Sequence, residues 1–527
     1  MPGPFCKINY TLNTPRFFNL GIILLFIIIV ILPILFMMVA PFWGQNAYPL
    51  GTLFDERHFG LAKNSLELAV GTICLSLVIG IPLAFLLSRT NLWAKNLFKT
   101  LYLIPILIPP YIHAIVWSHL DSWISQFLSL DIHSLYGAIF VLTLAYFPFV
   151  TLMTISGIKS IDRNLEEASL IHHGPWKTLR GITLPLALPH ILSGALFVFI
   201  FSIIDFGVPD ILRVNVYPVE IFIQFGALYD ERAAAMLSFP LITITLILVM
   251  LQKWYMGGRS YVNLTAGSGK DITYHLGIIN PLAFTFCLIV FSLSVLIPVV
   301  VLVKKAGSLS NYIRVLNTSI DQITYSLILA VLGGLLALFL GFFMSYIIER
   351  TKSKVVICLE LASLIPFAIP AITLGIGLIK VWNRPTIDFV FRCPLIIILG
   401  YIAHSISFTI RIICSGIKQI NPHLEEAGFL GTSSWTKVVG KIVMALLTPS
   451  LLVGFFIAFI LSLGELGTTL LVIPPGRETI PIKIYNLMHY GADQMVAALC
   501  LILVGITLAF SAIFLGFYKR AKMFLRC

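Results

Sequence analysis

Charged residues are scarce in this chain of 527 residues: Asp, Glu, Lys and Arg together make up only 11% of it. Soluble domains carry about a quarter of such residues, so the composition excludes a water-soluble globular protein. Long polar stretches are lacking as well, and no loop is long enough to fold into a soluble catalytic domain. Hydrophobic residues reach 58% and the mean hydropathy is +0.98. The composition therefore predicts a chain whose solvent is the lipid bilayer.

Paired cysteines are also lacking. The eight cysteines include no CxxC motif and no regular spacing, which argues against a disulfide framework or a metal cluster; they are Cys6, Cys74, Cys287, Cys358, Cys393, Cys414, Cys500 and Cys527. Metal-ligand spacing is likewise missing among the scattered histidines, namely His113, His119, His133, His190, His404, His423 and His489. We expect no metal site.

A phosphate-binding loop is not formed by Gly267-Ser268-Gly269-Lys270, because Leu264 replaces the first glycine of that motif and Asp271 follows the lysine. We expect a linker here and no ATP or other cofactor on the chain itself. No Ser/His/Asp or paired-carboxylate constellation is readable, so we expect a protein that is not an enzyme. The net charge of +12 comes from dispersed basic residues without interleaved aromatics, which argues against nucleic acid as a partner.

Apolar runs predict an all-α integral membrane protein with about twelve spanning helices. They lie near residues 17–42, 64–88, 97–119, 134–156, 186–206, 234–256, 276–303, 323–348, 355–380, 393–414, 445–464 and 493–518. The first run is too long for a cleaved signal peptide. Of the 35 basic residues, 23 fall on the side that holds both termini. The positive-inside rule makes that side cytoplasmic, at the bacterial inner membrane.

The sequence repeats itself. Residues 156–168 read SGIKSIDRNLEEA and residues 415–427 read SGIKQINPHLEEA, with nine of thirteen positions identical at an offset of 259. Trp176 and Trp435 keep that offset, and Arg89-Thr90 matches Arg350-Thr351 at 261. We therefore predict two tandem six-helix halves, residues 1–256 and 276–527, joined by a cytoplasmic linker over 257–275. Equal orientation of the halves implies a pseudo-twofold axis along the membrane normal with a pathway between them.

The repeated cytoplasmic segments, 157–185 and 416–449, have the pattern of a short amphipathic helix, a break, and the entry to a spanning helix. Leu165, Ala168 and Ile171-His172 share one helical face, and Glu166-Glu167 lie in the first turn, where the helix dipole favours acidic residues. A surface helix of this kind can dock into a groove on a partner.

These segments resemble the permease subunits of binding-protein-dependent ABC importers, whose cytoplasmic loop has a Glu-Ala-Ala segment, a glycine six residues after the Glu, and then Ile-x-Leu-Pro. The resembling residues are Glu166, Ala168 and Ile182-Thr183-Leu184-Pro185 in the first half, and Glu425, Ala427 and Gly431 in the second. The sequence departs from this pattern at His172, which replaces the glycine with Gly174 two residues later, and at Met444, which replaces the proline, with Pro449 one residue out of register.

The resemblance implies that these loops are coupling helices that bind two copies of a separate ATPase subunit, which would hold ATP and Mg²⁺. It also implies an extracytoplasmic substrate-binding protein on the other face. The residues implied in ATPase coupling are Glu166, Glu167, Ala168, His172, Gly174, Glu425, Glu426, Ala427 and Gly431.

Further stretches look like the fused twelve-span ferric iron permeases, among them LYLIPILIPPYIHAIVW from Leu101, DFGVPDIL from Asp205 and IFIQFGALYDERAAA from Ile221. Permeases for thiamine, phosphonates, polyamines or sulfate share much of this pattern, so ferric iron is the favoured cargo among several. An ion-coupled secondary transporter with two six-span halves is the alternative from another class. It would need more intramembrane charges than this chain carries, and would have no reason to keep two matched Glu-Glu-Ala loops.

Charges within apolar segments are functional candidates, because placing one there costs at least ~2.5–3.5 kcal/mol. Asp205 and Glu465 occupy equivalent places near the outer end of the fifth span of each half. A carboxylate pair facing one pathway would attract a cation such as Fe³⁺. Capping of loop turns at the membrane interface is the alternative role for both residues.

Overall fold

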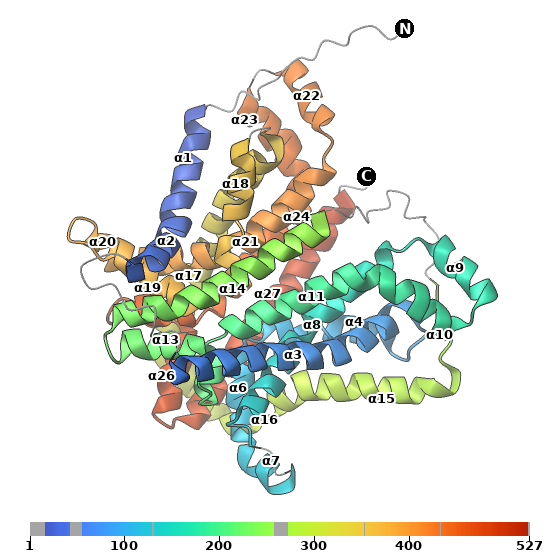
Figure 1. Ribbon diagram of the computed structural model, residues 1–527. Helices are drawn as coiled ribbons and strands as arrows, with labels where there is room; N and C mark the ends of the chain where they lie inside the picture. Colours follow the sequence, from blue (N-terminus) through green and yellow to red (C-terminus); the bar gives the residue numbers. More distant parts are fainter. Residues whose placement is uncertain are drawn as a thin grey trace.

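The computed structural model describes residues 16–42, 55–128, 131–257, 272–351, 354–432 and 434–524. Cys6, Cys527 and most of the predicted linker, including Gly267–Lys270, lie outside these residues. Within the described ranges the regular secondary structure is helical, apart from one isolated bridge between Thr90 and Tyr274. The prediction of an all-α membrane protein is confirmed (Figure 1).

In the part of the chain that the structure describes, ten helical segments are long and apolar enough to cross a bilayer. In the first half they comprise α1 to α2 (Arg16–Phe26, Leu32–Val39), α3 (Glu56–Arg89), α8 (Leu135–Ser160), α10 to α11 (Pro175–Thr178, Leu184–Ile204) and α14 (Glu231–Gly257). In the second half they comprise α15 to α16 (Asn280–Phe291, Ile297–Ala306), α17 (Leu309–Arg350), α21 (Leu395–Gln419), α23 to α24 (Trp435–Val438, Met444–Leu463) and α27 (Asp493–Phe524). Short π-helical turns continue four of these segments: η1 (Ile27–Ile31), η4 (Leu179–Thr183), η6 (Ser292–Leu296) and η8 (Val439–Val443).

Two predicted spans, 97–119 and 355–380, are not continuous helices, which corrects the sequence prediction. The first consists of α4 (Lys95–Leu101), α5 (Ile104–Leu107) and α6 (Pro110–His119), and the second of α18 (Lys354–Ala362), η7 (Ile365–Ala368) and α19 (Ala371–Trp382). They bend by 92° and 113°. Proline forces the bend, because Ile108 and Ile369 each precede a proline, adopt extended backbone and so end the helix. The described residues therefore contain ten helices that could span a bilayer, or twelve spans if each bent pair counts as one.

Each half is built on a bundle of three helices: α3, α8 and α11 in the first half, and α17, α21 and α24 in the second. Equivalent glycines allow the first two helices of each bundle to approach closely. A Cβ on Gly80 would lie 2.9 Å from Val150, and one on Gly341 would lie 2.7 Å from Thr409. Small residues at such crossings are typical of membrane helices, where close packing takes the place of the hydrophobic effect.

The first helix of each predicted half packs against the other half. Phe26, Val30 and Ile34 of the N-terminal helix are buried among residues of α17, α19 and α21. In the other direction, Cys287 and Val290 of α15 pack against Leu83 and Leu87 of α3 and their neighbours. Figure 1 shows α1 beside the second half and α15 along the first. This exchange joins the two halves into one body.

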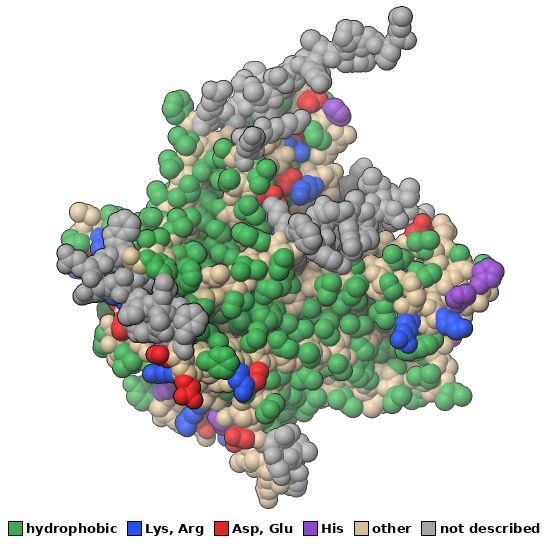
Figure 2. Space-filling view, in the orientation of Figure 1, with side chains coloured by type: hydrophobic (Ala, Val, Ile, Leu, Met, Phe, Trp, Pro, Cys, Tyr) green, Lys and Arg blue, Asp and Glu red, His purple; other side chains and the backbone are tan. Residues whose placement is uncertain are grey.

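Apolar side chains cover most of the face shown in Figure 2, and charged side chains gather toward its edges. The short helices that connect the spans are α7 (Asp121–Leu128), α9 (Arg163–His172), α12 (Gly207–Ile211), α13 (Tyr217–Gly226), α20 (Asp388–Phe391), α22 (Pro422–Gly431), α25 (Gly467–Val472) and α26 (Ile480–His489). The described residues also form two 3-10 turns, η2 (Ala40–Phe42) and η5 (Gly277–Ile279). This distribution of polarity fits a body embedded in lipid.

Candidate coupling helices and the interface between the halves

The two repeated loops each form a short helix, as the sequence predicts. Helix α9 begins after Asp162, whose carboxylate accepts a hydrogen bond from Asn164 N at 3.0 Å. Helix α22 begins after Asn421, whose side-chain oxygen accepts from His423 N at 3.1 Å. Asp and Asn are favoured at this position because they satisfy backbone N–H groups that the helix leaves unpaired.

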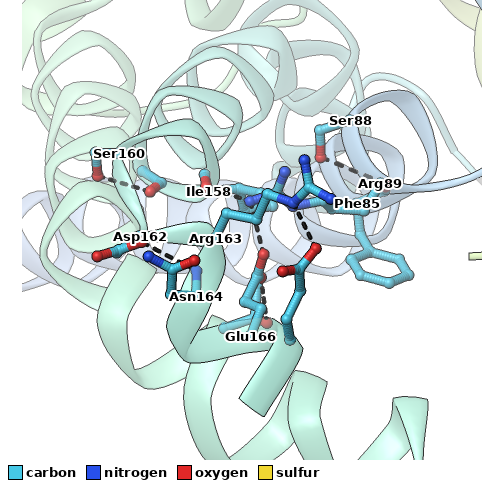
Figure 3. A network of polar contacts seen from close by, with 12 residues as sticks. Phe85, Ser88, Arg89, Ile158, Ser160, Asp162, Arg163, Asn164 and Glu166 are labelled. Atoms are coloured by element: carbon cyan, nitrogen blue, oxygen red, sulfur yellow. Dashed lines mark hydrogen bonds and ion pairs between the residues drawn. The ribbon is translucent and has the colours of Figure 1, made fainter. Parts of the chain in front are cut away.

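Glu166 does not face solvent: it is fully buried at the base of α9. Its carboxylate lies 2.8 Å from Arg89 Nη2, at the end of α3, and accepts a hydrogen bond from Thr183 Oγ1 at 2.8 Å. Arg89 Nη2 also donates to the carbonyl of Ile158 at 3.0 Å, at the end of α8 (Figure 3). The first glutamate of the motif therefore ties α9 to the spanning helices.

Glu425 repeats this arrangement in the second half, where it is 3% exposed. Arg350 Nε contacts its Oε1 at 2.7 Å, and the Tyr346 hydroxyl donates to its Oε2 at 2.8 Å. Arg350 also donates to the carbonyl of Ile420 at 3.1 Å. A buried ion pair with its remaining lone pairs satisfied holds its geometry firmly, because separating it would leave a charge without a partner in an apolar region.

The other predicted coupling residues lie at the surface. Glu167 forms a half-exposed pair with Arg163 at 2.5 Å, and Glu426 contacts His423 at 2.8 Å. The remaining members are exposed, namely Ala168, His172, Gly174, Ala427 and Gly431. The structure thus separates the nine predicted residues into two buried anchors and seven surface residues.

Large apolar side chains are exposed on and beside both short helices, and these include residues that the motif does not contain. Ile171 is 80% exposed and Leu430 is 87% exposed. Leu165, Trp176 and Leu424 are also exposed. The helical face predicted from Leu165, Ala168 and Ile171 contains part of this set, whereas Leu430 could have been found only by comparing the two repeats position by position.

Asp205 and Glu465 both cap a short helix that follows a spanning helix. Asp205 Oδ1 accepts from Val208 N at 2.9 Å, and Tyr146 OH donates to Oδ2 at 3.0 Å. Glu465 is 5% exposed and accepts from the backbone N–H groups of Thr468 and Thr469 at 2.6 and 2.8 Å. Both carboxylates therefore have the capping role, and Asp205 remains the more open of the two.

These two connections meet where the halves meet. A Cβ on Gly207 would lie 3.8 Å from Leu466, and one on Gly464 would lie 2.9 Å from Pro109. Polar contacts also cross between the halves: Tyr485 OH donates to Asp210 at 2.9 Å, and Thr245 Oγ1 donates to the carbonyl of Ala368 at 2.6 Å. Asp205 and Glu465 therefore lie beside the interface between the halves, where a pathway is expected.

The chain leaving the predicted linker attaches beside the first anchor. Tyr274 N donates to the carbonyl of Arg89 at 2.7 Å, and Leu276 N donates to Asn91 Oδ1 at 2.9 Å. Burial raises the pKa of the Tyr274 phenol, the Glu166 carboxylate raises it further, and Arg89 opposes this shift. The phenol is therefore neutral at physiological pH.

Sequence spacing gave no sign of one group of possible metal ligands. Ligand atoms of Asp121, Asp131 and His133 lie within 4.8 Å of one another beside α7. Their oxygens already accept from backbone N–H groups, since Asp121 binds Ile132 N at 2.9 Å and Asp131 binds His133 N at 2.7 Å. These bonds close the connection between α7 and α8.

Comparison with known proteins agrees with this architecture. Residues 76–260 match the family described as "Binding-protein-dependent transport system inner membrane component". The Fe(3+)-transport system permease protein FbpB 2 of Haemophilus influenzae is 24% identical over 85% of this chain and 87% of its own length. The ferric transport system permease protein FbpB of Actinobacillus pleuropneumoniae is 24% identical over 93% of this chain and 76% of its own length.

Other relatives cover less of the chain. A putative 2-aminoethylphosphonate transport system permease protein, PhnV, of Salmonella typhimurium is 27% identical over 38% of this chain and 76% of its own length. Residues 76–260 therefore match the family of binding-protein-dependent transport system inner membrane components, and most of the chain is similar to ferric transport permeases, in agreement with its many apolar helices.

Proposed function

We propose that this chain forms the transmembrane pathway of an ATP-driven importer for ferric iron. The repeated buried anchor of two short helices, Arg89–Glu166 and Arg350–Glu425, supports this proposal most directly. A helix held rigidly to the spanning bundle by a buried ion pair can transmit a force, whereas a loosely tethered loop cannot. Two matched helices fit two copies of one ATPase subunit.

This arrangement assigns a role to each subunit of the proposed importer. The ATPase copies would hold ATP and Mg²⁺ and grip the segments 157–185 and 416–449 through the exposed apolar residues of α9 and α22. A substrate-binding protein would dock on the opposite, extracytoplasmic face. Both termini would be cytoplasmic, in keeping with the bias of basic residues. The halves, residues 1–256 and 276–527, would be related by a pseudo-twofold axis along the membrane normal and would rock against each other.

Ferric iron as cargo is supported by the likeness to ferric permeases over most of the chain, whereas the aminoethylphosphonate relative matches only 38% of it. Asp205 fits the same cargo, because an oxygen ligand beside the interface between the halves would attract a hard trivalent cation. The rate of transport would then depend on this carboxylate more than on Glu465, which is enclosed by its helix cap.

The test is uptake of ⁵⁵Fe³⁺ into cells that lack this chain, with and without its restoration, and with thiamine and phosphonate uptake as parallel measurements. We expect restoration of iron uptake alone. If cells that lack the chain take up iron normally but are defective in thiamine or phosphonate uptake, the substrate is that other compound. Uptake that persists when ATP is depleted but collapses with a protonophore at constant ATP would instead favour the secondary transporter.

A further inference from the structure

Six aromatic side chains from both halves meet between the spanning helices. Phe201, one turn before the end of α11, contacts all five of the other rings. Its centroid lies 5.0 Å from that of Phe149, 5.5 Å from Phe367 and 6.0 Å from Phe408. We call this group the aromatic constriction; it comprises Tyr146, Phe149, Phe197, Phe201, Phe367 and Phe408.

The rings lie on internal helices, yet each is only partly buried. Helices α8 and α21 are 67% and 78% buried over their apolar windows, compared with 33% for α3. The contacts of Phe197 and Phe201 with Phe367, and of Phe201 with Phe408, cross between the halves, so the group lies at the interface between them. The bend that breaks the span at Pro370 places Phe367 in the group.

One member of the group, Tyr146, forms a polar pair with Asp205 at one end of the constriction. Tyr146 OH donates to Asp205 at 3.0 Å, and Asp205 follows the last residue of α11. The arrangement is therefore a carboxylate and a hydroxyl on the predicted outer side, followed inward by phenyl rings. A constriction lined by apolar rings excludes water and hydrated ions, because no group in it replaces their hydration.

The constriction is also connected to the coupling helices. Phe149 and Phe408 are equivalent residues of the repeat, 259 positions apart, near the middle of α8 and α21. Helix α8 ends at Ser160, three residues before α9 begins, and α21 ends at Gln419, three residues before α22 begins. A displacement of both short helices would therefore act on these two rings through two continuous helices.

We propose that the aromatic constriction is the closed gate of the translocation pathway and that it opens when α8 and α21 draw Phe149 and Phe408 away from Phe201. This inference rests on the proposed transport function. In the closed arrangement the rings stop a cation at the Tyr146–Asp205 pair, and motion of the two coupling helices removes the barrier.

The test uses the full-length permease in sealed liposomes without its ATPase, with passive K⁺ flux followed by a trapped K⁺-sensitive dye. Liposomes with the wild-type permease should show little passive K⁺ flux. F201A/F408A removes two facing rings and should raise the flux by about tenfold or more, since a constriction that stays wet conducts ions. F201L/F408L keeps apolar bulk and should stay near the wild-type value.

Phe456 provides the matched control. It is the repeat equivalent of Leu196, the residue before Phe197, and its ring stacks on Phe514 at 4.2 Å within its own half. F456A should therefore be as tight as the wild type. If F201A/F408A does not reconstitute as a monodisperse protein, the single variant F201A is measured in its place, with a smaller increase expected.

K⁺ flux at the wild-type level in F201A/F408A, or in F201A where it is measured instead, would overturn the gate, as would an equal rise in F456A. Energised ⁵⁵Fe³⁺ uptake by the wild-type complex is measured separately. If iron uptake fails while K⁺ flux still rises only in the alanine variants of Phe201 and Phe408, the proposal of ferric iron as cargo is wrong and the proposed gate stands.

Discussion

Arg350 and Glu425 form a buried ion pair at 2.7 Å in the same place where Arg89 and Glu166 pair in the first half. Each pair joins the C-terminal end of a long spanning helix to a short surface helix. The surroundings differ, since Tyr346 donates to Glu425 whereas Thr183 donates to Glu166. Helices α9 and α22 are therefore held by the same ionic contact, supported by different neighbours.

Arg89→Ala should detach α9 from the bundle, because it leaves the fully buried carboxylate of Glu166 without its cation. Breaking a buried pair in this way costs about 3–5 kcal/mol. We expect amide hydrogen exchange in α9 to rise by about two to three orders of magnitude, with exchange in α22 unchanged. R89A/E166A should regain much of the protection, because no buried charge remains.

Glu167→Ala is the matched control on the same helix. Its pair with Arg163 is half exposed and should contribute no more than about 1 kcal/mol. Exchange in α9 that rises equally in E167A and R89A would contradict the anchoring role of Glu166.

Ile171→Asp and Leu430→Asp should separate docking from anchoring. Both side chains are more than three quarters exposed, at 80% and 87%, so the substitutions should leave the fold and thermal stability of the permease unchanged. A charge placed in an apolar docking groove should weaken ATPase capture by about tenfold or more per site. Co-purification with the ATPase subunit measures this, and an undiminished yield in the double variant would show that the ATPase docks elsewhere.

The repeat in the sequence indicated similar local structure at equivalent positions, because similar sequences fold into similar local structure. Gly80 and Gly341 lie at equivalent helix crossings, and the two Glu-Glu-Ala loops form equivalent helices. The two bent spans could not be placed from hydropathy, since an apolar run has the same mean hydropathy whether it is straight or folded. Pro109-Pro110 carried the relevant signal, because two adjacent prolines cannot continue a helix.

The role of Glu166 also lay beyond the motif itself. Acidic residues in the first turn of an amphipathic helix are usually solvated, and only the partner at Arg89, 77 positions earlier, makes this residue an internal anchor. Matching offsets for Arg89/Arg350 and Glu166/Glu425 were visible in the sequence, but offsets do not state which residues are in contact. The aromatic constriction was hidden for the same reason, because its rings come from segments up to 262 positions apart.

Asp205→Asn should distinguish a cargo role from a capping role. Asn caps a helix about as well as Asp, so the bond from Val208 N should persist and thermal stability should change little. Loss of the charge beside the interface should lower ⁵⁵Fe³⁺ uptake by about tenfold, as for a pair of opposite charges worth about 1.4 kcal/mol. Wild-type uptake in D205N, with normal assembly, would leave Asp205 with its capping role alone.

Phe26→Ala tests the exchange of first helices. Phe26 is fully buried among residues of the second half, so the cavity should cost about 3–5 kcal/mol. The loss should appear as faster hydrogen exchange in α17 and α21, which belong to the other half, and leave α3 and α8 protected. Val290→Ala in α15 should do the reverse and expose α3, because it packs there. If each variant loosened only the half in which it lies in sequence, the first helices would not be exchanged.

Reciprocal effects would mean that neither half can move without carrying a helix of the other. Rocking of the halves must then include bending at η1 and η6, the π-helical turns within these two helices.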